Sequence, residues 1–294
     1  MKKESLMKEI TIDVPAKINF SIDVTGKLPN GYHSLEMIMQ TISLYDTVTV
    51  EKKNSGISVQ CDFPYVPNDS RNVAWKAAEA FFAECPEKGG ATIILKKTIP
   101  VSSGLAGGSA DAAGVLKCLN KLYGGHLGNF KMIEIARKVG ADVPFCLQGG
   151  TALAKGIGDE IVHLPDFSGF RVVVVKPPFP VSTAWVFNNL KMDQLGERPN
   201  TSALISAIEE MDVLTLAQGM RNVLESVTVK TYKEIGNIIG EFLTYNALGS
   251  RMTGSGSAVF GLFEDDKTAQ CAFEQFSNRY EQVYLAETIN RREE

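Results

Sequence analysis

A mixed α+β fold divided into two domains is the fold class that the sequence predicts. Its 294 residues correspond to about two domains of ordinary size. β-Branched runs and helical segments occur in both halves of the chain, which is typical of α/β or α+β proteins. The segment "LPDFSGF" at residues 164–170 separates the two mixtures. We therefore expect one domain at residues 1–165 and a second at residues 166–294.

Composition narrows the class of protein. Hydrophobic residues make up 44% of the chain and charged residues 22%, which is the balance of a globular protein. The net charge of −4 comes without a long basic run, so no nucleic-acid partner is expected. The N-terminal "MKKESLMKEI" lacks the apolar core of a signal peptide, and no apolar run reaches the ~18 residues of a membrane span. We expect a cytoplasmic protein with a small-molecule ligand and no membrane partner; the sequence leaves the oligomeric state open.

Strands and helices alternate in the first half of the chain. The β-branched stretch at residues 10–26 predicts a strand interrupted near Pro15, and residues 46–60 predict two short strands around an Asn-Ser-Gly turn. A helix at residues 73–83 follows the capping candidates Asn, Asp and Ser. The remaining elements expected here are a strand at 91–99 and helices at 110–124 and 130–139, the last ending at a glycine.

The second half begins with "FRVVVVKPP" at residues 170–178, a short β-branched run that is typical of a centrally buried strand. Residues 182–246 are predicted to be mostly helical. A β segment with a glycine turn at 251–263, a helix at 266–280 and a strand at 282–289 complete the expected order.

The segment "IPVSSGLAGGSADAAG" at residues 99–114 joins a predicted strand to an alanine-rich helix. Glycine lets the backbone adopt positive φ and bring successive N–H groups close to a ligand. The helix that follows adds the unpaired N–H groups of its first turn, and Ser109 is placed to cap it or to bind an oxyanion. A phosphate suits this arrangement, although a glycine-rich connection without a ligand is common. The segment is neither a GxxxxGK(S/T) loop nor a dinucleotide GxGxxG fingerprint, and the chain lacks the HRD and DFG signatures of protein kinases.

Three further segments, taken with this loop, resemble the GHMP kinase superfamily. They are "PAKINFSIDVTGKLPNGYH", "GADVPFCLQGG" and "MTGSGSAVF", in the same order along the chain. The resemblance implies an N-terminal ribosomal-protein-S5-like domain that carries an ATP-binding glycine loop. It also implies a C-terminal ferredoxin-like α+β domain that contributes to the substrate cleft.

Within the superfamily the details resemble the 4-diphosphocytidyl-2-C-methyl-D-erythritol kinases of the non-mevalonate isoprenoid pathway. "GYH" is followed by a Q-x-x-x-L-x-D pattern, and "GLAGGSADAAG" is similar to that family's GLGGGSSDAA loop. Two positions depart from the loop pattern. Ala106 replaces a glycine, which we expect to be a mild change, and Ala110 removes a hydroxyl that would otherwise offer a second serine ligand.

The resemblance implies transfer of phosphate from ATP to the 2-hydroxyl of the methylerythritol unit, with Mg²⁺ bridging the phosphates. Asp142 is then the general base that accepts the hydroxyl proton. Lys17 would pair with that carboxylate and offer positive charge to the acceptor oxygen, because an unpaired buried ammonium is costly. Asn19 lies two residues further along a strand, on the same face, and would orient the acceptor.

The resemblance also implies binding residues. Tyr32 stacks on the cytosine of the cytidine diphosphate-linked substrate, His33 hydrogen-bonds its edge and Phe187 forms a second stacking face. ATP is expected to contact the loop residues Pro100, Val101, Ser102, Ser103, Gly104, Leu105, Ala106, Gly107, Gly108 and Ser109. The other binding residues that the resemblance implies are Asn72 and Lys97 at the adenine pocket and Ser109 as a contributor to the metal site. Gly254 and Ser255 are expected among the substrate-binding residues, and with Gly256 they form the C-terminal glycine motif, which supports the phosphate loop.

Alternatives remain for the function of the whole protein and for the roles of single residues. The protein as a whole is alternatively another GHMP kinase, of the homoserine or mevalonate type, a catalytically silent nucleotide binder of the same fold, or, least in keeping with its charge, a nucleic-acid-binding module. For single residues, Asp142 is alternatively a turn residue, Lys17 an exposed edge-strand lysine and Asn19 a cap. Tyr32 and His33 are alternatively loop residues, Phe187 a core residue, and the 254–256 turn a plain hairpin turn.

Overall fold

The structure is a computed structural model that describes residues 8–29 and 31–291, and these residues form two compact units. Unit 1 comprises residues 8–15, 45–99 and 107–147. Unit 2 comprises the described residues among 16–44, 100–106 and 148–291. Unit 1 lies wholly before residue 165 and unit 2 takes segments from both sides of it, so the domain boundary at 165 stays a prediction. Most of the N-terminal segment considered for a signal peptide, and Asn30 just before the "GYH" motif, lie outside the described residues.

Two long strands, β1 (Glu9–Lys27) and β2 (His33–Lys53), contribute residues to both units. In unit 1 the end of β2 pairs antiparallel with β4 (Gly90–Lys96), and β4 pairs parallel with β3 (Gly56–Cys61). The helices of this unit are α1 (Val73–Glu84), α2 (Gly107–Leu122), α3 (Asn129–Val139) and α4 (Val143–Gln148).

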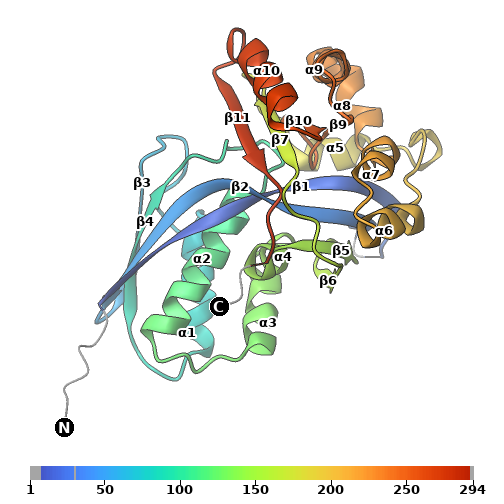
Figure 1. The fold of residues 1–294 in the computed structure, drawn as a ribbon. Helices are drawn as coiled ribbons and strands as arrows, with labels where there is room; N and C mark the ends of the chain where they lie inside the picture. Colours follow the sequence, from blue (N-terminus) through green and yellow to red (C-terminus); the bar gives the residue numbers. More distant parts are fainter. Residues whose placement is uncertain (1–7, 30, 292–294) are drawn as a thin grey trace. The chain divides into compact units, whose positions relative to one another are not determined.

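Helix α1 packs against α2 and α3, so these three helices lie side by side in Figure 1. Gly114 explains how closely α2 approaches the strands of its unit. A Cβ atom at this position would lie 2.5 Å from Val14 Cγ1 and 3.2 Å from Val48 Cγ2, so a larger residue would push the helix outward. The small alanine and glycine residues of α2 therefore allow the helix to pack closely against the strands, in addition to forming the glycine-rich start of the helix.

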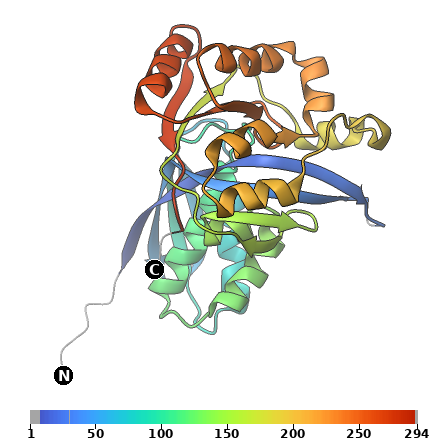
Figure 2. The same ribbon diagram turned by 45° about the vertical axis from the view of Figure 1, so that its right-hand side comes forward.

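In unit 2 the first part of β2 pairs with β5 (Thr151–Lys155), β5 pairs with β6 (Glu160–His163), and β1 pairs with β8 (Arg221–Asn222). A second, antiparallel sheet has the order β11 (Gln282–Glu287), β7 (Arg171–Lys176), β10 (Val259–Phe263) and β9 (Gly249–Met252). This is the βαββαβ strand order of a ferredoxin-like sheet, with β7 in an inner position as its β-branched sequence predicts. Helix α10 (Asp266–Ser277), red in Figure 2, packs against β7, β10 and β11.

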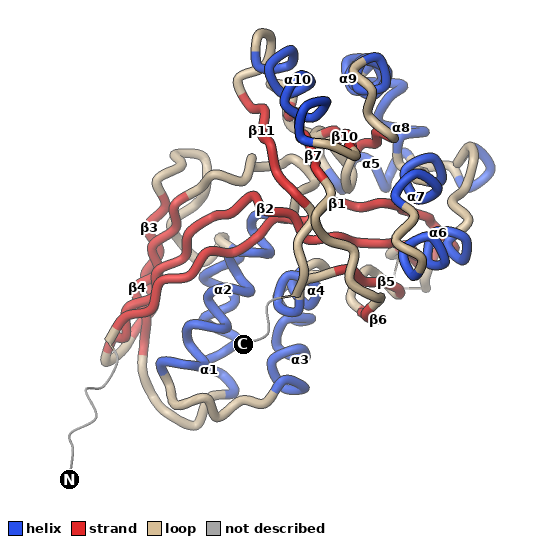
Figure 3. The backbone as a smooth tube through the Cα atoms, in the orientation of Figure 1, coloured by secondary structure: helices blue, strands red, loops and turns tan. Residues whose placement is uncertain are grey.

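The stretch between β7 and β9 is mainly helical, as Figure 3 shows in blue. Its elements are α5 (Thr183–Asn189), the 3₁₀ helix η1 (Met192–Gln194), α6 (Thr201–Glu209), α7 (Val213–Gly219), α8 (Glu225–Thr231) and α9 (Lys233–Thr244). Among the residues that the structure describes, no helix has the length and apolar character needed to cross a membrane.

The predicted mixed fold and most of its elements are confirmed, and three details were wrong. Strand β1 continues through Pro15, because proline removes an N–H group but keeps the extended φ that a strand accepts. The turn between two strands within residues 46–60 is confirmed, but the first of them is the end of the long strand β2 and not a short strand, and β3 pairs with β4. The short helix α4 was not predicted, because its six residues are too few to show a helical period.

Candidate active site

Hydrogen bonds to the carbonyl groups of the glycine loop hold its backbone in place. Three consecutive carbonyl oxygens accept hydrogen bonds within unit 2: that of Ser103 from the N–H of Ala258 (3.0 Å), that of Gly104 from Thr253 Oγ1 (3.3 Å) and that of Leu105 from the N–H of Lys17 (3.1 Å). In a trans peptide the N–H of the next residue points the opposite way from the carbonyl. The N–H groups of residues 104–106 therefore point away from these partners, and only that of Leu105 meets a side chain of the loop itself, Ser103 Oγ, at 3.3 Å.

Backbone conformation in the loop alternates in a way that favours anion binding. Ser102, Gly104 and Ala106 have positive φ values of 54°, 83° and 59°, with residues of ordinary φ between them. Alternation of this kind turns successive N–H groups toward a common point and is found at phosphate sites. The next residue, Gly107, begins α2, whose first-turn N–H groups have no partner within the helix. The loop thus has the donors that nucleotide phosphates require, supplied by backbone.

Glycine is required at one loop position and has been replaced at another. A Cβ atom at Gly104 would lie 2.1 Å from the carbonyl oxygen of Thr253, a distance that no relaxation of a flexible side chain could relieve. Ala106, in contrast, carries its methyl group at φ 59°, where an L-residue costs about 1–2 kcal/mol relative to the right-handed region. The expectation that alanine is a mild change for the phosphate-binding backbone stays a prediction, and this strain is what the methyl group costs at position 106.

Lys17 and Asn19 lie together, as their spacing on β1 predicts. Lys17 Nζ donates to Asn19 Oδ1 at 2.7 Å, and both residues are buried. The same oxygen accepts the N–H of Gly254 at 3.1 Å and Thr253 Oγ1 at 3.3 Å. Asn19 therefore joins the lysine to the glycine turn that follows β9, and Thr253 joins this turn to Gly104. The two glycine segments and Lys17 form one hydrogen-bonded group within unit 2.

The second glycine turn has further support inside its own unit. Asn222 Nδ2 donates to the carbonyl oxygens of Met252 (2.7 Å) and Gly254 (2.8 Å), and Ser255 Oγ lies 2.7 Å from Thr183 Oγ1 on α5. Ser255 is buried, with 6% of its surface exposed. Sequence reasoning did not identify Thr253 or Asn222, because a single threonine or asparagine next to a glycine turn carries no distinctive pattern.

The predicted cytosine-binding residues lie together in unit 2. The His33 ring stacks on Phe187 with centroids 5.3 Å apart and an interplanar angle of 26°. Phe187 is only half-buried on α5, so it is not a core residue, and Tyr32 is 61% exposed. Burial, with a further contribution from Lys27, lowers the pKa of His33 below 6.5, so its imidazole is neutral at pH 7. A neutral imidazole offers one hydrogen-bond donor and one acceptor, which suits the polar edge of a base.

The remaining predicted residues lie in unit 1. Asp142 directly precedes α4, and its carbonyl accepts the N–H of Cys146 at 3.0 Å. Asn72 is the N-cap of α1: its oxygen accepts the N–H of Ala74 (2.9 Å) and its nitrogen donates to the carbonyl of Pro67 (2.8 Å). The catalytic role of Asp142 and the adenine-binding role of Asn72 stay predictions.

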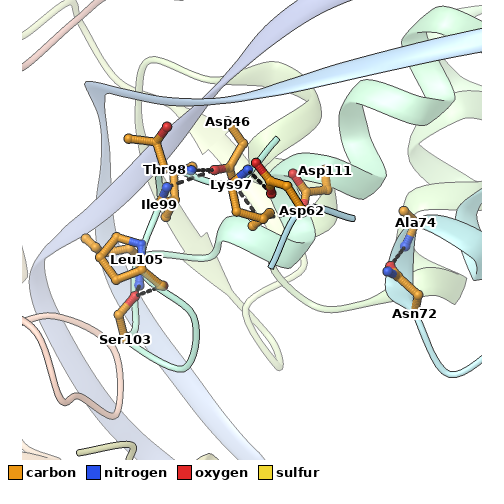
Figure 4. Close-up of polar contacts among 11 residues, drawn as sticks. Asp46, Asp62, Asn72, Ala74, Lys97, Thr98, Ile99, Ser103, Leu105 and Asp111 are labelled. Atoms are coloured by element: carbon orange, nitrogen blue, oxygen red, sulfur yellow. Dashed lines mark hydrogen bonds and ion pairs between the residues drawn. The ribbon is translucent and has the colours of Figure 1, made fainter. Parts of the chain in front are cut away.

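The side chain of Lys97 is buried between two carboxylates, those of Asp46 and Asp111, as Figure 4 shows. Neither aspartate was predicted as a site residue. Each stands in a motif that the sequence displays, since Asp46 ends the Q-x-x-x-L-x-D pattern and Asp111 follows the glycine loop. An aspartate that falls on the buried face of an alanine-rich helix is the signal that could have identified Asp111.

Comparisons with known proteins agree with this picture. Residues 72–150 match the GHMP kinases N terminal domain and residues 204–282 match the GHMP kinases C terminal domain. The chain is 47% identical over 283 residues to a 4-diphosphocytidyl-2-C-methyl-D-erythritol kinase of Acetivibrio thermocellus, covering 96% of this chain and 100% of that relative. It is also 47% identical over 274 residues to the enzyme of the same name from Clostridium botulinum, covering 93% and 98%.

Solved structures give the same result. A crystal structure of a 4-(cytidine 5'-diphospho)-2C-methyl-D-erythritol kinase matches with a TM-score of 0.80 and 31% identity, covering 95% of this chain and 98% of that one. Homoserine kinase from Cytophaga hutchinsonii also matches with a TM-score of 0.80, over 99% and 98% of the two chains, but at 19% identity, which shows the fold alone. The chain therefore belongs to the GHMP kinases and, among them, to the 4-diphosphocytidyl-2-C-methyl-D-erythritol kinase family.

Proposed function

We propose that this GHMP kinase, an ATP-dependent small-molecule kinase, phosphorylates the 2-hydroxyl of 4-diphosphocytidyl-2-C-methyl-D-erythritol. The observation that carries the proposal is the stack of His33 on Phe187 beside the exposed Tyr32. Aromatic faces and a neutral imidazole together suit a planar base, whereas homoserine and mevalonate have no base to bind. The 47% identity to relatives that bear this name supports the same acceptor.

In the proposed reaction the backbone N–H groups of the loop and of the first turn of α2 bind the phosphates of ATP. The groups that bind the phosphates are preorganised. Lys17 is held by its hydrogen bond to Asn19, and the hydrogen bonds to the loop carbonyls fix the backbone whose N–H groups would bind the phosphates. Asp142 accepts the proton of the substrate's 2-hydroxyl group while the oxygen of that hydroxyl forms a bond to the γ-phosphorus of ATP. The bond from that phosphorus to the bridging oxygen breaks, and ADP leaves with the electron pair.

Mg²⁺ would neutralise charge on the β- and γ-phosphates in this chemistry. Among the described residues, no group of three or more His, Cys, Asp or Glu side chains is placed to hold a metal ion. Magnesium in phosphoryl-transfer sites is usually held by one or two protein oxygens, the nucleotide and water, so this finding fits a nucleotide-borne ion. Ser109, half-buried in the first turn of α2, is the protein oxygen we propose for it.

The direct test measures ATP-dependent phosphorylation by the purified protein with Mg²⁺ and three acceptors. We expect turnover with 4-diphosphocytidyl-2-C-methyl-D-erythritol and none with homoserine or mevalonate. Turnover of one of the other acceptors would contradict the proposed substrate. ATP binding without turnover of any acceptor would instead favour a silent nucleotide binder.

Replacing Tyr32 with alanine tests the cytosine site. Stacking of a base on an aromatic ring contributes about 1–3 kcal/mol, so Tyr32→Ala should raise KM for the cytidylylated substrate by about 5- to 150-fold. The KM for ATP should change less than twofold. Tyr65→Ala removes another exposed tyrosine, 84% exposed in unit 1, and serves as the matched control with no expected effect. An unchanged KM for the substrate in Tyr32→Ala would remove this residue from the cytosine site.

A further inference from the structure

Three buried side chains of unit 1 meet next to the residues that precede and follow the glycine loop. Lys97 Nζ donates to Asp46 Oδ2 and, at 2.5 Å, to Asp111 Oδ2. The side-chain exposures are 4% for Lys97, 0% for Asp46 and 4% for Asp111. Figure 4 shows the lysine between the two carboxylates. We refer to Asp46, Lys97 and Asp111 as the clasp.

The clasp joins the two ends of the nucleotide-binding segment. Asp46 Oδ1 accepts the N–H groups of Thr98 (2.6 Å) and Ile99 (2.8 Å), the last residues before the loop. Asp111 lies on α2, four residues after the helix begins. A bond between Lys97 and Asp111 therefore closes the chain on either side of the loop and reduces the number of conformations open to it.

Glycine 107 shows how closely the two ends approach. A Cβ atom at this position would lie 3.0 Å from Ile99 Cγ2 and 3.3 Å from Lys97 Nζ. The start of α2 thus lies close to Ile99, whose N–H group Asp46 accepts, and there is little room at this position for any residue larger than glycine.

The clasp contains one cationic group and two carboxyl groups. Asp46 and Lys97 alone would form a neutral pair, and Asp111 adds a second carboxylate whose Oδ1 accepts no hydrogen bond from any described residue. Burial raises the pKa of Asp111 to about 7, with Lys97 opposing the shift. An unbonded buried carboxylate oxygen lowers stability, so Asp111 is a poor choice for a purely structural position. Features that break the rules of stable packing are concentrated at functional sites.

We propose that the clasp sets the conformation of the glycine loop for nucleotide binding, with Asp111 and Lys97 as positioning residues that act through the loop. The inference rests on the proposed role of the loop in binding ATP. It assigns to the three side chains a role in nucleotide affinity and none in recognition of the cytidylylated substrate.

The test compares Asp111→Leu and Asp111→Asn with the wild-type protein. Leucine removes the bond to Lys97 and leaves a neutral Asp46–Lys97 pair; asparagine keeps the shape if leucine does not fold. We expect the Kd for ATP, measured by calorimetry, to rise about tenfold or more in Asp111→Leu and less in Asp111→Asn. The KM for the cytidylylated substrate should stay within twofold, and Tm should not fall.

A matched control and a local readout separate positioning from structure. Asp62→Asn changes an exposed carboxylate that accepts the backbone N–H of Lys97 at 2.9 Å, and it should leave the Kd for ATP unchanged. Hydrogen exchange should quicken in Asp111→Leu at the N–H groups of Lys17 and Ala258, because both donate to loop carbonyls.

Two results would contradict the proposed role of the clasp without affecting the proposed function of the protein. One is an unchanged Kd for ATP in a folded Asp111→Leu protein. The other is an equal loss of affinity for ATP and for the second substrate together with a lower Tm, which would make Asp111 structural. If the wild-type protein bound no ATP, the proposed function would fail as well, so the two failures are distinguishable.

Discussion

Asp142→Asn should lower kcat by about 10²- to 10⁴-fold, the contribution of a positioned general base. Asparagine has the shape of aspartate but cannot accept the proton of the acceptor hydroxyl. The backbone of Asp142 supports α4 through its bond with Cys146, and this bond survives the substitution. We therefore expect the Kd for ATP and the Tm to stay close to their wild-type values. Steady-state kinetics, calorimetry and thermal unfolding measure the three quantities.

A second aspartate provides the control for Asp142. Asp69 lies exposed in the same unit, where it pairs with Arg71, so Asp69→Asn should leave kcat unchanged. Loss of ATP binding and of thermal stability in parallel with kcat would identify Asp142 as a turn residue of structural importance. Full activity in Asp142→Asn would exclude it as the base.

Gly104→Ala should raise the KM for ATP by about 100-fold or more. The added Cβ would lie 2.1 Å from the carbonyl oxygen of Thr253, at φ 83°, so the loop has to move away from the turn that supports it. That movement breaks the bond from Thr253 Oγ1 to the carbonyl of Gly104 and turns the N–H groups of the loop out of their present directions. Initial-rate kinetics with varied ATP, together with calorimetry, measure the effect.

Gly169 separates steric collision from backbone strain in that experiment. Its φ is 89°, close to that of Gly104, yet nothing lies within 4 Å of an added Cβ. Gly169→Ala should therefore lower stability by about 1–2 kcal/mol and leave the KM for ATP unchanged. If Gly104→Ala bound ATP as the wild type does, the loop would not be the phosphate-binding element.

Local pattern was enough to predict most elements of the fold. The β-branched run of β7 and the cap before α1 depend on residues within a few positions of one another, so they are visible in the sequence. Helix α4 was missed because it is shorter than two turns, and the continuity of β1 through Pro15 was missed because it depends on pairing with other strands.

By itself the sequence determined most of the elements and singled out the glycine loop and the pair Tyr32 and His33 as candidates, because each pattern is carried by neighbouring residues. Only the tertiary structure decided that Asp46 and Asp111 both bind Lys97, and that Thr253, which also bonds to Asn19, donates to the loop carbonyl of Gly104. Contacts of this kind join strands and helices far apart in the chain. They follow from strand register and helix packing, which no local pattern of residues encodes.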